Sequence, residues 1–223
     1  MKNYRYFKRL SISVILLLSL QLIVGCKSKL VEDETVNFNI IDFNLDQLDS
    51  DGNIQFNLKS KEALIDPTNT NINISKLRIT LYRNSTAIYL ISSKLGYFDR
   101  LRNIITLKRE VILKDLTARN NSEIITDRLT WNLNSKILHL EGNIKMTTDS
   151  SKLIAHKAIY DQNINKINIY QIKKYEVYNY NNDLKTRPTF SLMSDKAILD
   201  RANNKLVFYS DLNKVQSKIN LDR

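Results

Sequence analysis

Few residues of this sequence have the type and spacing that catalysis requires. The chain has two histidines, His139 and His156, and one cysteine, Cys26. Such side chains can act as general acids and bases, nucleophiles or metal ligands. Neither histidine lies in a nucleophile elbow, a glycine-rich phosphate loop or a zinc motif. One cysteine and two distant histidines cannot form a zinc site by themselves. We therefore expect no catalytic residue, no metal and no cofactor.

The carboxylates are equally dispersed. Glu123, Asp127 and Glu141 could each belong to an acid–base pair, but the sequence does not favour one pair over another. One hypothesis for the function is therefore an envelope enzyme that modifies lipids. It requires the folded chain to bring acidic residues or histidines into one cluster.

Cys26 ends an N-terminal segment that has the form of a secretory signal. Residues 1–9 are basic and aromatic, and residues 10–24 are mostly apolar or small. The segment from Ile23 to Cys26 resembles the lipobox of bacterial lipoproteins, in which the cysteine thiol receives a diacylglyceryl group. We predict a signal peptide or membrane anchor over residues 1–26, lipidation at Cys26, and a short tether over residues 27–35.

A retained transmembrane helix is the alternative for this segment. About 15 apolar residues at 1.5 Å each span roughly 22 Å, which is short of a hydrocarbon core of about 30 Å. Including Tyr6 and Phe7 in the apolar segment brings its length closer to the thickness of the hydrocarbon core. Both alternatives leave the rest of the chain on the far side of the membrane, anchored at its N-terminus.

A short sequence motif, which we call the phrase, recurs five times in the rest of the chain. It consists of a small or apolar residue, a bulky apolar or aromatic residue, and a turn-forming residue. The copies recur about every 30 to 40 residues, which is typical of repeat architectures, and a cation precedes the last four. They are Ala63-Leu64-Ile65-Asp66, Leu95-Gly96-Tyr97-Phe98-Asp99, Leu129-Thr130-Trp131-Asn132, Ala158-Ile159-Tyr160-Asp161 and Ala197-Ile198-Leu199-Asp200.

A second alternating run follows each of the last four phrases. In a strand, alternate side chains face opposite sides, so Ile105 and Leu107 share one face while Thr106 points the other way. The connecting segments are rich in asparagine and aspartate, which favour turns. Each unit is therefore predicted to be a hairpin, and residues 36–223 to be a single all-β domain.

The repeat aims its apolar residues to one side of the predicted sheet and so forms a continuous apolar trough. An apolar ligand that enters such a trough gains roughly 0.8 kcal/mol per buried methylene. The groove-lining candidates are Ile65, Tyr97, Ile105, Leu107, Trp131, Leu138, Leu140, Tyr160, Ile167, Ile169, Leu199, Leu206 and Phe208.

The formal net charge of +11 is the other compositional signal. The sequence has no compact basic helix and no signature of a nucleic-acid-binding fold, so we expect no nucleic-acid partner. A basic surface suits anionic lipid headgroups and phosphorylated glycolipids.

The anchor, the β body and the hairpin repeats together resemble the LptC family of lipopolysaccharide export proteins and its relatives, LptA and the LptD N-terminal domain. The resemblance lies in residues 194–208, in the stretch Leu138-His139-Leu140-Glu141-Gly142-Asn143-Ile144 and in the opening segment, residues 40–60. It extends over most of residues 36–215.

The resemblance implies a twisted, open antiparallel β-jellyroll that shelters lipid acyl chains. It further implies a non-enzymatic component of lipopolysaccharide export at the periplasmic face of the inner membrane. The implied partners are lipopolysaccharide, an LptA-like bridge protein and LptB/LptF/LptG-like transporter subunits. The alternative is a structural envelope lipoprotein whose filled β core scaffolds a protein partner.

Overall fold

In the computed structural model, one antiparallel sheet of twelve strands contains all the described secondary structure. The structure describes residues 37–49, 51–117, 122–178, 190–203, 205–210 and 218–220. They belong to a unit that extends from Val36 to Arg223. The predicted signal, the lipidation site at Cys26 and the tether therefore lie outside the described residues.

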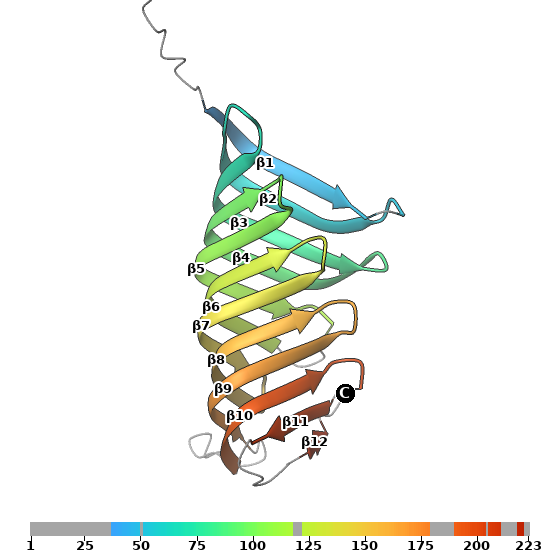
Figure 1. The fold of residues 1–223 in the computed structure, drawn as a ribbon, viewed down its shortest axis with the longest axis vertical. Coiled ribbons are helices and arrows are strands. Elements are labelled where there is room, and N and C mark those ends of the chain that lie inside the picture. The colour runs from blue at the N-terminus through green and yellow to red at the C-terminus, as the bar shows by residue number, and fades with distance from the viewer. Residues whose placement is uncertain are drawn as a thin grey trace, which may run out of the picture. The chain divides into compact units, whose positions relative to one another are not determined.

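Each strand pairs with its neighbours in the chain, in the order β1 to β12 (Figure 1). This order confirms the prediction of an all-β fold built of consecutive hairpins. The strands are β1 (Phe38–Leu48), β2 (Ile54–Ile65), β3 (Asn71–Arg83), β4 (Thr86–Asp99), β5 (Ile104–Asp115), β6 (Ser122–Asn132), β7 (Ile137–Thr147), β8 (Ser151–Asp161), β9 (Lys166–Val177), β10 (Phe190–Asp200), β11 (Lys205–Tyr209) and β12 (Lys218–Asn220).

The last residue of each repeated phrase caps a turn. Asp66 accepts a hydrogen bond from the backbone N–H of Thr70 at 2.7 Å, and Asp99 accepts one from Arg102 at 2.9 Å. The equivalent side chains of Asn132, Asp161 and Asp200 also accept backbone N–H groups. The asparagine and aspartate side chains thus hold the backbone turn, as their frequency in the sequence predicts.

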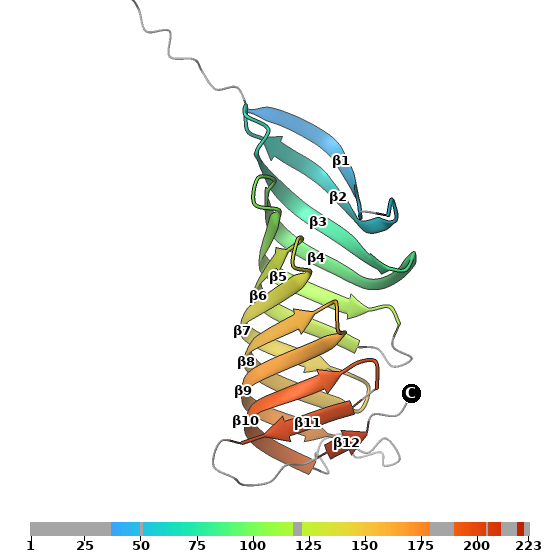
Figure 2. The same ribbon diagram turned by 45° about the vertical axis from the view of Figure 1, so that its right-hand side comes forward.

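Most strands bend at mid-length, at positions that we call corners. At the β4–β5 corner, Ser93 Oγ donates to the Lys108 carbonyl at 2.7 Å. The following residues of β5, Arg109 and Glu110, have positive φ. The register of the β4–β5 pair shifts here. A bulge bends a strand and increases its twist, so these corners fold the sheet over on itself (Figures 1 and 2).

Each strand therefore has two halves, which we call arms. The first arm borders the turns near residues 51–53, 84–85, 116–117 and 148–150, which form the first rim. The second arm borders the turns at residues 66–70, 100–103, 133–136, 162–165 and 201–203, which form the second rim.

The inner faces of the two arms pack against each other and form the core. The ring of Phe56, in the first arm of β2, lies 5.0 Å from that of Trp131, in the second arm of β6. The rings of Tyr89 on β4 and Tyr160 on β8 pack edge to face at 5.6 Å. The hydrophobic core is thus formed between strands that lie four apart in the sheet.

Candidate functional site

Twelve of the thirteen predicted groove residues lie on the inner face, in two adjacent cross-strand rows. In the row nearer the second rim, Ile105 pairs with Trp131, and Trp131 pairs with Leu138. In the row nearer the corners, Leu107 pairs with Leu129. The further predicted members of these rows are Leu140, Tyr160, Ile167, Ile169, Leu199, Leu206 and Phe208, with Ile65 at the β2 end. The rows form a continuous apolar surface across the sheet.

The prediction for Tyr97 is wrong. Its neighbour Phe98 occupies the inner row, where it pairs with Ile105 and is 3% exposed. Tyr97 pairs with Thr106 on the outer face and is 38% exposed. Its hydroxyl donates a hydrogen bond to Asn71 Oδ1 at 2.6 Å. Two adjacent aromatic residues fit the phrase equally well, and strand alternation can place only one of them inside.

Most of the inner row is completely covered. Leu107, Leu138 and Ile169 have at most 1% of their surface exposed. Ile65 and Leu199 are half-buried. At the β1 end the apolar surface opens to solvent, because Phe38 and Ile40 remain 58% and 36% exposed. The inner surface is therefore a closed core along most of the sheet and an open apolar face at β1.

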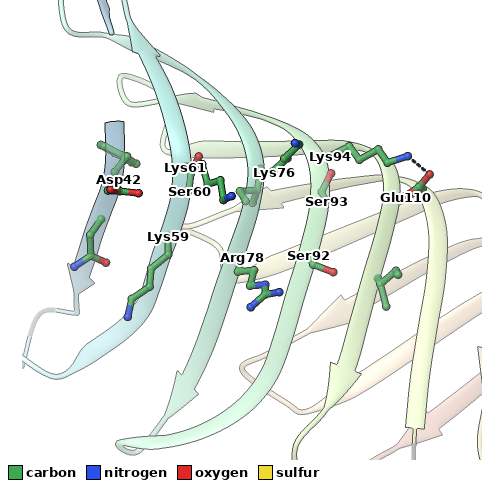
Figure 3. A pocket seen from close by; sticks show the side chains of 14 residues that line it. Asp42, Lys59, Ser60, Lys61, Lys76, Arg78, Ser92, Ser93, Lys94 and Glu110 are labelled. Atoms are coloured by element: carbon green, nitrogen blue, oxygen red, sulfur yellow. Dashed lines mark hydrogen bonds and ion pairs between the residues drawn. The ribbon is translucent and has the colours of Figure 1, made fainter. Parts of the chain in front are cut away.

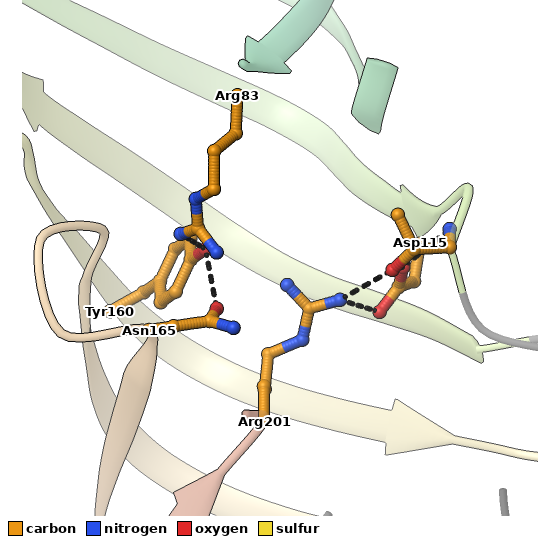
Figure 4. A network of polar contacts seen from close by, with 6 residues as sticks. Arg83, Asp115, Tyr160, Asn165 and Arg201 are labelled. Atoms are coloured by element: carbon orange, nitrogen blue, oxygen red, sulfur yellow. Dashed lines mark hydrogen bonds and ion pairs between the residues drawn. The ribbon is translucent and has the colours of Figure 1, made fainter. Parts of the chain in front are cut away.

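Polar bridges join the two rims along a line that we call the seam. Arg83, at the end of β3 on the first rim, donates to the Tyr160 hydroxyl at 2.9 Å and to the Gln162 carbonyl at 2.8 Å. Tyr160 in turn donates to Asn165 Oδ1 at 3.1 Å (Figure 4). The two contacts of Arg83 join residues 77 and 79 positions apart in the chain, on opposite rims.

A second bridge lies farther along the seam. Arg201, in the β10–β11 turn, forms an ion pair with Asp115 at the end of β5. Both side chains are largely buried. The Arg201 guanidinium also lies 4.7 Å from the ring centre of Tyr89, a distance at which cation–π attraction is favourable. Burial raises the pKa of the Tyr89 hydroxyl, so it remains protonated at neutral pH.

The seam is the part of the closed core where the two arms could separate without breaking the sheet. Opening it breaks contacts between rims, whereas the ladders between neighbouring strands remain. Neighbouring turns of the second rim are also joined by backbone hydrogen bonds. The N–H of Arg100 donates to the Thr70 carbonyl, and the N–H of Arg201 donates to the Asn165 carbonyl. Among the described residues, Trp131 Nε1 is buried without a hydrogen-bond partner, which is costly in a static core.

The sequence-based prediction missed the corner hydroxyls. Ser60, Ser93, Thr126 and Ser194 each stand six residues before the turn-forming residue that ends a phrase. Thr126 Oγ1 donates to the Glu141 carbonyl at 2.9 Å, and Ser60 Oγ to the Ser75 carbonyl at 2.7 Å. The recurrence at one offset was visible in the sequence, and only the fourth copy departs from it, with Ala155.

The potentially catalytic residues remain apart. His139 lies on the outer face between Thr130 and Ile159, and His156 is exposed. Within the described ranges, no three histidine, cysteine or acidic side chains lie close enough to hold a metal ion. The same ranges contain no helix long and apolar enough to cross a bilayer. Within the described ranges, the geometry offers an apolar surface and a polar seam.

A match to a protein-family model shows the family of this chain. Residues 10–171 match the model described as "Lipopolysaccharide-assembly, LptC-related". The chain belongs to this LptC-related family. The match confirms the family resemblance seen in the sequence. LptC-related proteins are periplasmic transport components, not enzymes, so this chain has a non-enzymatic role in lipopolysaccharide transport.

One solved structure shows a partial likeness to this chain. The crystal structure of LptH from Pseudomonas aeruginosa, described as the LptA-homologous periplasmic component of the lipopolysaccharide transport device, is 9% identical to this LptC-related chain. The alignment covers 62% of this chain and 92% of LptH, with a TM-score of 0.41. No curated protein sequence matches this chain.

Proposed function

We propose that the inner face of this protein carries the acyl chains of lipopolysaccharide from an inner-membrane ABC transporter to a following β-jellyroll. The observation that supports this most is the uninterrupted inner row. It extends from the exposed Phe38 at β1 to Leu206 on β11, with an apolar side chain contributed at every strand between them. Acyl chains could pass from strand to strand along it without crossing a polar barrier.

In this proposal lipid enters as the arms separate at the seam. Contacts between the arms are then replaced by contacts with an acyl chain. Burial of the acyl chain contributes a favourable free energy of roughly 0.8 kcal/mol per methylene. The bridges of Arg83 and Arg201 then close the seam again when the lipid has passed. Many weak, similar contacts favour movement along the path over tight retention at one place.

The partners follow from the same geometry and from the family. Within the described part of the chain, the edge strands β1 and β12 each pair with one neighbour in the sheet. An exposed strand edge can pair with another chain, and a like-folded bridge protein added there would extend the inner face. The proposed N-terminal anchor at Cys26, or a retained membrane helix, would hold the protein at the periplasmic face of the inner membrane.

Copurified lipid tests the proposal. Full-length protein is purified, and its bound lipid is identified by mass spectrometry, for wild type and for Ile65→Arg and Leu64→Arg. Ile65 is a half-buried inner residue, and its neighbour Leu64 faces outward and is 38% exposed. We expect lipopolysaccharide with wild type and Leu64→Arg, and at least a fivefold loss with Ile65→Arg. Equal lipid in all three proteins would contradict an inner path.

The closed core also favours a second candidate function, that of a structural envelope lipoprotein. Complete burial of residues such as Leu107 and Trp131 is what a permanently filled core would show. That function predicts no copurified glycolipid and no effect of Ile65→Arg on envelope partners. Lipid in the wild-type protein distinguishes the two.

A further inference from the structure

A hollow of about 650 Å³ opens on the outer face of β1 to β5, on the opposite side of the sheet from the inner row. Five cations line it, against two carboxylates, Asp42 and Glu110 (Figure 3). One of the two, Glu110, already forms an ion pair with Lys94. The cations are Lys59 and Lys61 on β2, Lys76 and Arg78 on β3, and Lys94 on β4.

Four of these cations form no ion pair with another residue that the structure describes. Among the described residues, no carboxylate lies within ion-pair distance of Lys59, Lys61, Lys76 or Arg78, and all four side chains are exposed. Lys59 and Arg78 are moreover direct cross-strand partners. Like charges placed directly opposite each other destabilise a sheet. The hollow therefore holds an electrostatic cost that a bound anion would relieve.

The other corners show that this cost is not imposed by the fold. At the β4–β5 corner the outer positions hold the ion pair of Lys94 and Glu110. At the β6–β7 corner Asn143 donates to Asp127 at 2.8 Å. At the β10–β11 corner Ser210 donates to Asp195 at 3.2 Å. Three corners thus carry complementary pairs.

At the β2–β3 corner the corresponding positions hold two lysines, Lys61 and Lys76. Lys76 also has a φ of 50°, in the left-handed region that ordinary side chains rarely adopt. The equivalent residues at other corners, Glu110, Asn143 and Gln171, also have positive φ, so this conformation belongs to the bulge, and only the two like charges distinguish the β2–β3 corner.

From this charge pattern we infer that the outer hollow binds the phosphate group of an anionic lipid headgroup. A phosphate monoester carries nearly two negative charges and three acceptor oxygens, which match a group of unpaired ammonium and guanidinium donors. The hollow is also lined by apolar atoms of Phe43, Leu77 and Ile112, which would contact the glycerol and ester part of a lipid. The inference does not depend on an acyl-chain path along the inner face.

Binding to mixed micelles tests the inference with the full-length protein in neutral detergent. The micelles contain either phosphatidic acid or phosphatidylcholine, and inorganic phosphate and polyglutamate serve as competitors. The test variant is Lys61→Gln with Lys76→Gln. The matched control, Lys145→Gln with Lys173→Gln, removes the same charge from exposed lysines outside the hollow.

We expect wild type and the control to prefer phosphatidic acid, and the test variant to bind it about 30-fold more weakly, since each lysine near a lipid surface contributes about 1 kcal/mol. The lipid-free test variant should melt no lower than wild type, because it has lost a repulsion. Equal losses in both variants, or no preference for phosphatidic acid, would overturn the inference. Equal competition by inorganic phosphate would point to a small-anion site instead, and equal competition by polyglutamate to an acidic protein segment.

Discussion

The β2 to β11 part of the sheet is closed, whereas the β1 end is open, although both present the same inner row. In the closed part, Trp131 packs against Phe56 across the arms, and Arg201 bridges the rims. At the open end, Phe38 and Ile40 remain 58% and 36% exposed. The comparison shows that the sheet supplies the apolar surface, while contacts between the arms decide whether that surface is available.

The largest expected effect comes from removing a contact between the arms. Trp131→Ala should lower the free energy of unfolding by about 3–5 kcal/mol, because it leaves a cavity between β2 and β6. Phe38→Ala at the open end should cost less than about 1 kcal/mol. Urea denaturation of the two variants measures the difference. Similar costs would mean that the two regions are packed alike.

Breaking the seam should make the closed part resemble the open end. Arg201→Met removes the largely buried ion pair with Asp115 and should cost about 2–4 kcal/mol. Hydrogen exchange should then increase in β4 and β10. Arg102→Met on the same rim is the control, because Arg102 is 78% exposed and forms a weak 3.7 Å pair with Asp99. It should cost at most about 0.5 kcal/mol. Unchanged exchange in Arg201→Met would show that the bridge does not close the seam.

A corner hydroxyl should contribute less to the free energy of unfolding than the bridge across the seam does. Thr126→Val keeps the shape of the side chain but removes the donor to the Glu141 carbonyl, at a cost of about 1–2 kcal/mol. Thr130→Val, on the outer face of the same strand, controls for the change of residue type and should stay within about 0.5 kcal/mol. Thermal unfolding compares them. Equal losses of stability in the two variants would mean that the bulge bends the strand without help from the hydroxyl.

The smallest effect concerns a turn next to the open end. Burial favours the neutral acid at Asp66, but hydrogen bonds from Thr70 and Asn71 outweigh it and lower its pKa to about 2. The lowered pKa means that Asp66 stabilises the fold above its ordinary pKa, and that this contribution disappears as the pH falls towards 2. A carbon-detected NMR titration should give a midpoint near 2. Asp66→Asn should reduce the acid-induced loss of stability, and a midpoint at the ordinary value of 3.8 would refute the hydrogen-bond network.

Local patterns predicted most of the fold. Alternation placed Leu107, Leu140 and Phe208 on the inner face, and the aspartates of the phrases marked the turns. Both features depend on residues that are close in sequence, so one chain is sufficient to see them. The position of Tyr97 was missed because two aromatic residues stand side by side.

The seam and the outer hollow could not be predicted in the same way. Arg83 and Tyr160 meet only because the corners fold one arm over the other with an offset of several strands. That offset depends on the accumulated twist and on the bulges, which no local pattern specifies. The repulsive corner at Lys61 and Lys76 likewise becomes visible only when cross-strand register is known.

Photo-crosslinking tests the central claim, that the inner row carries lipid, most directly. A photoreactive amino acid is placed at Leu140, on the inner face, or at His139, its outward-facing neighbour, in full-length protein expressed in cells. The account predicts lipopolysaccharide adducts at position 140, stronger when Arg201→Met weakens the seam, and none at position 139. Adducts at position 139 alone, or protein adducts without lipid at both positions, would contradict it.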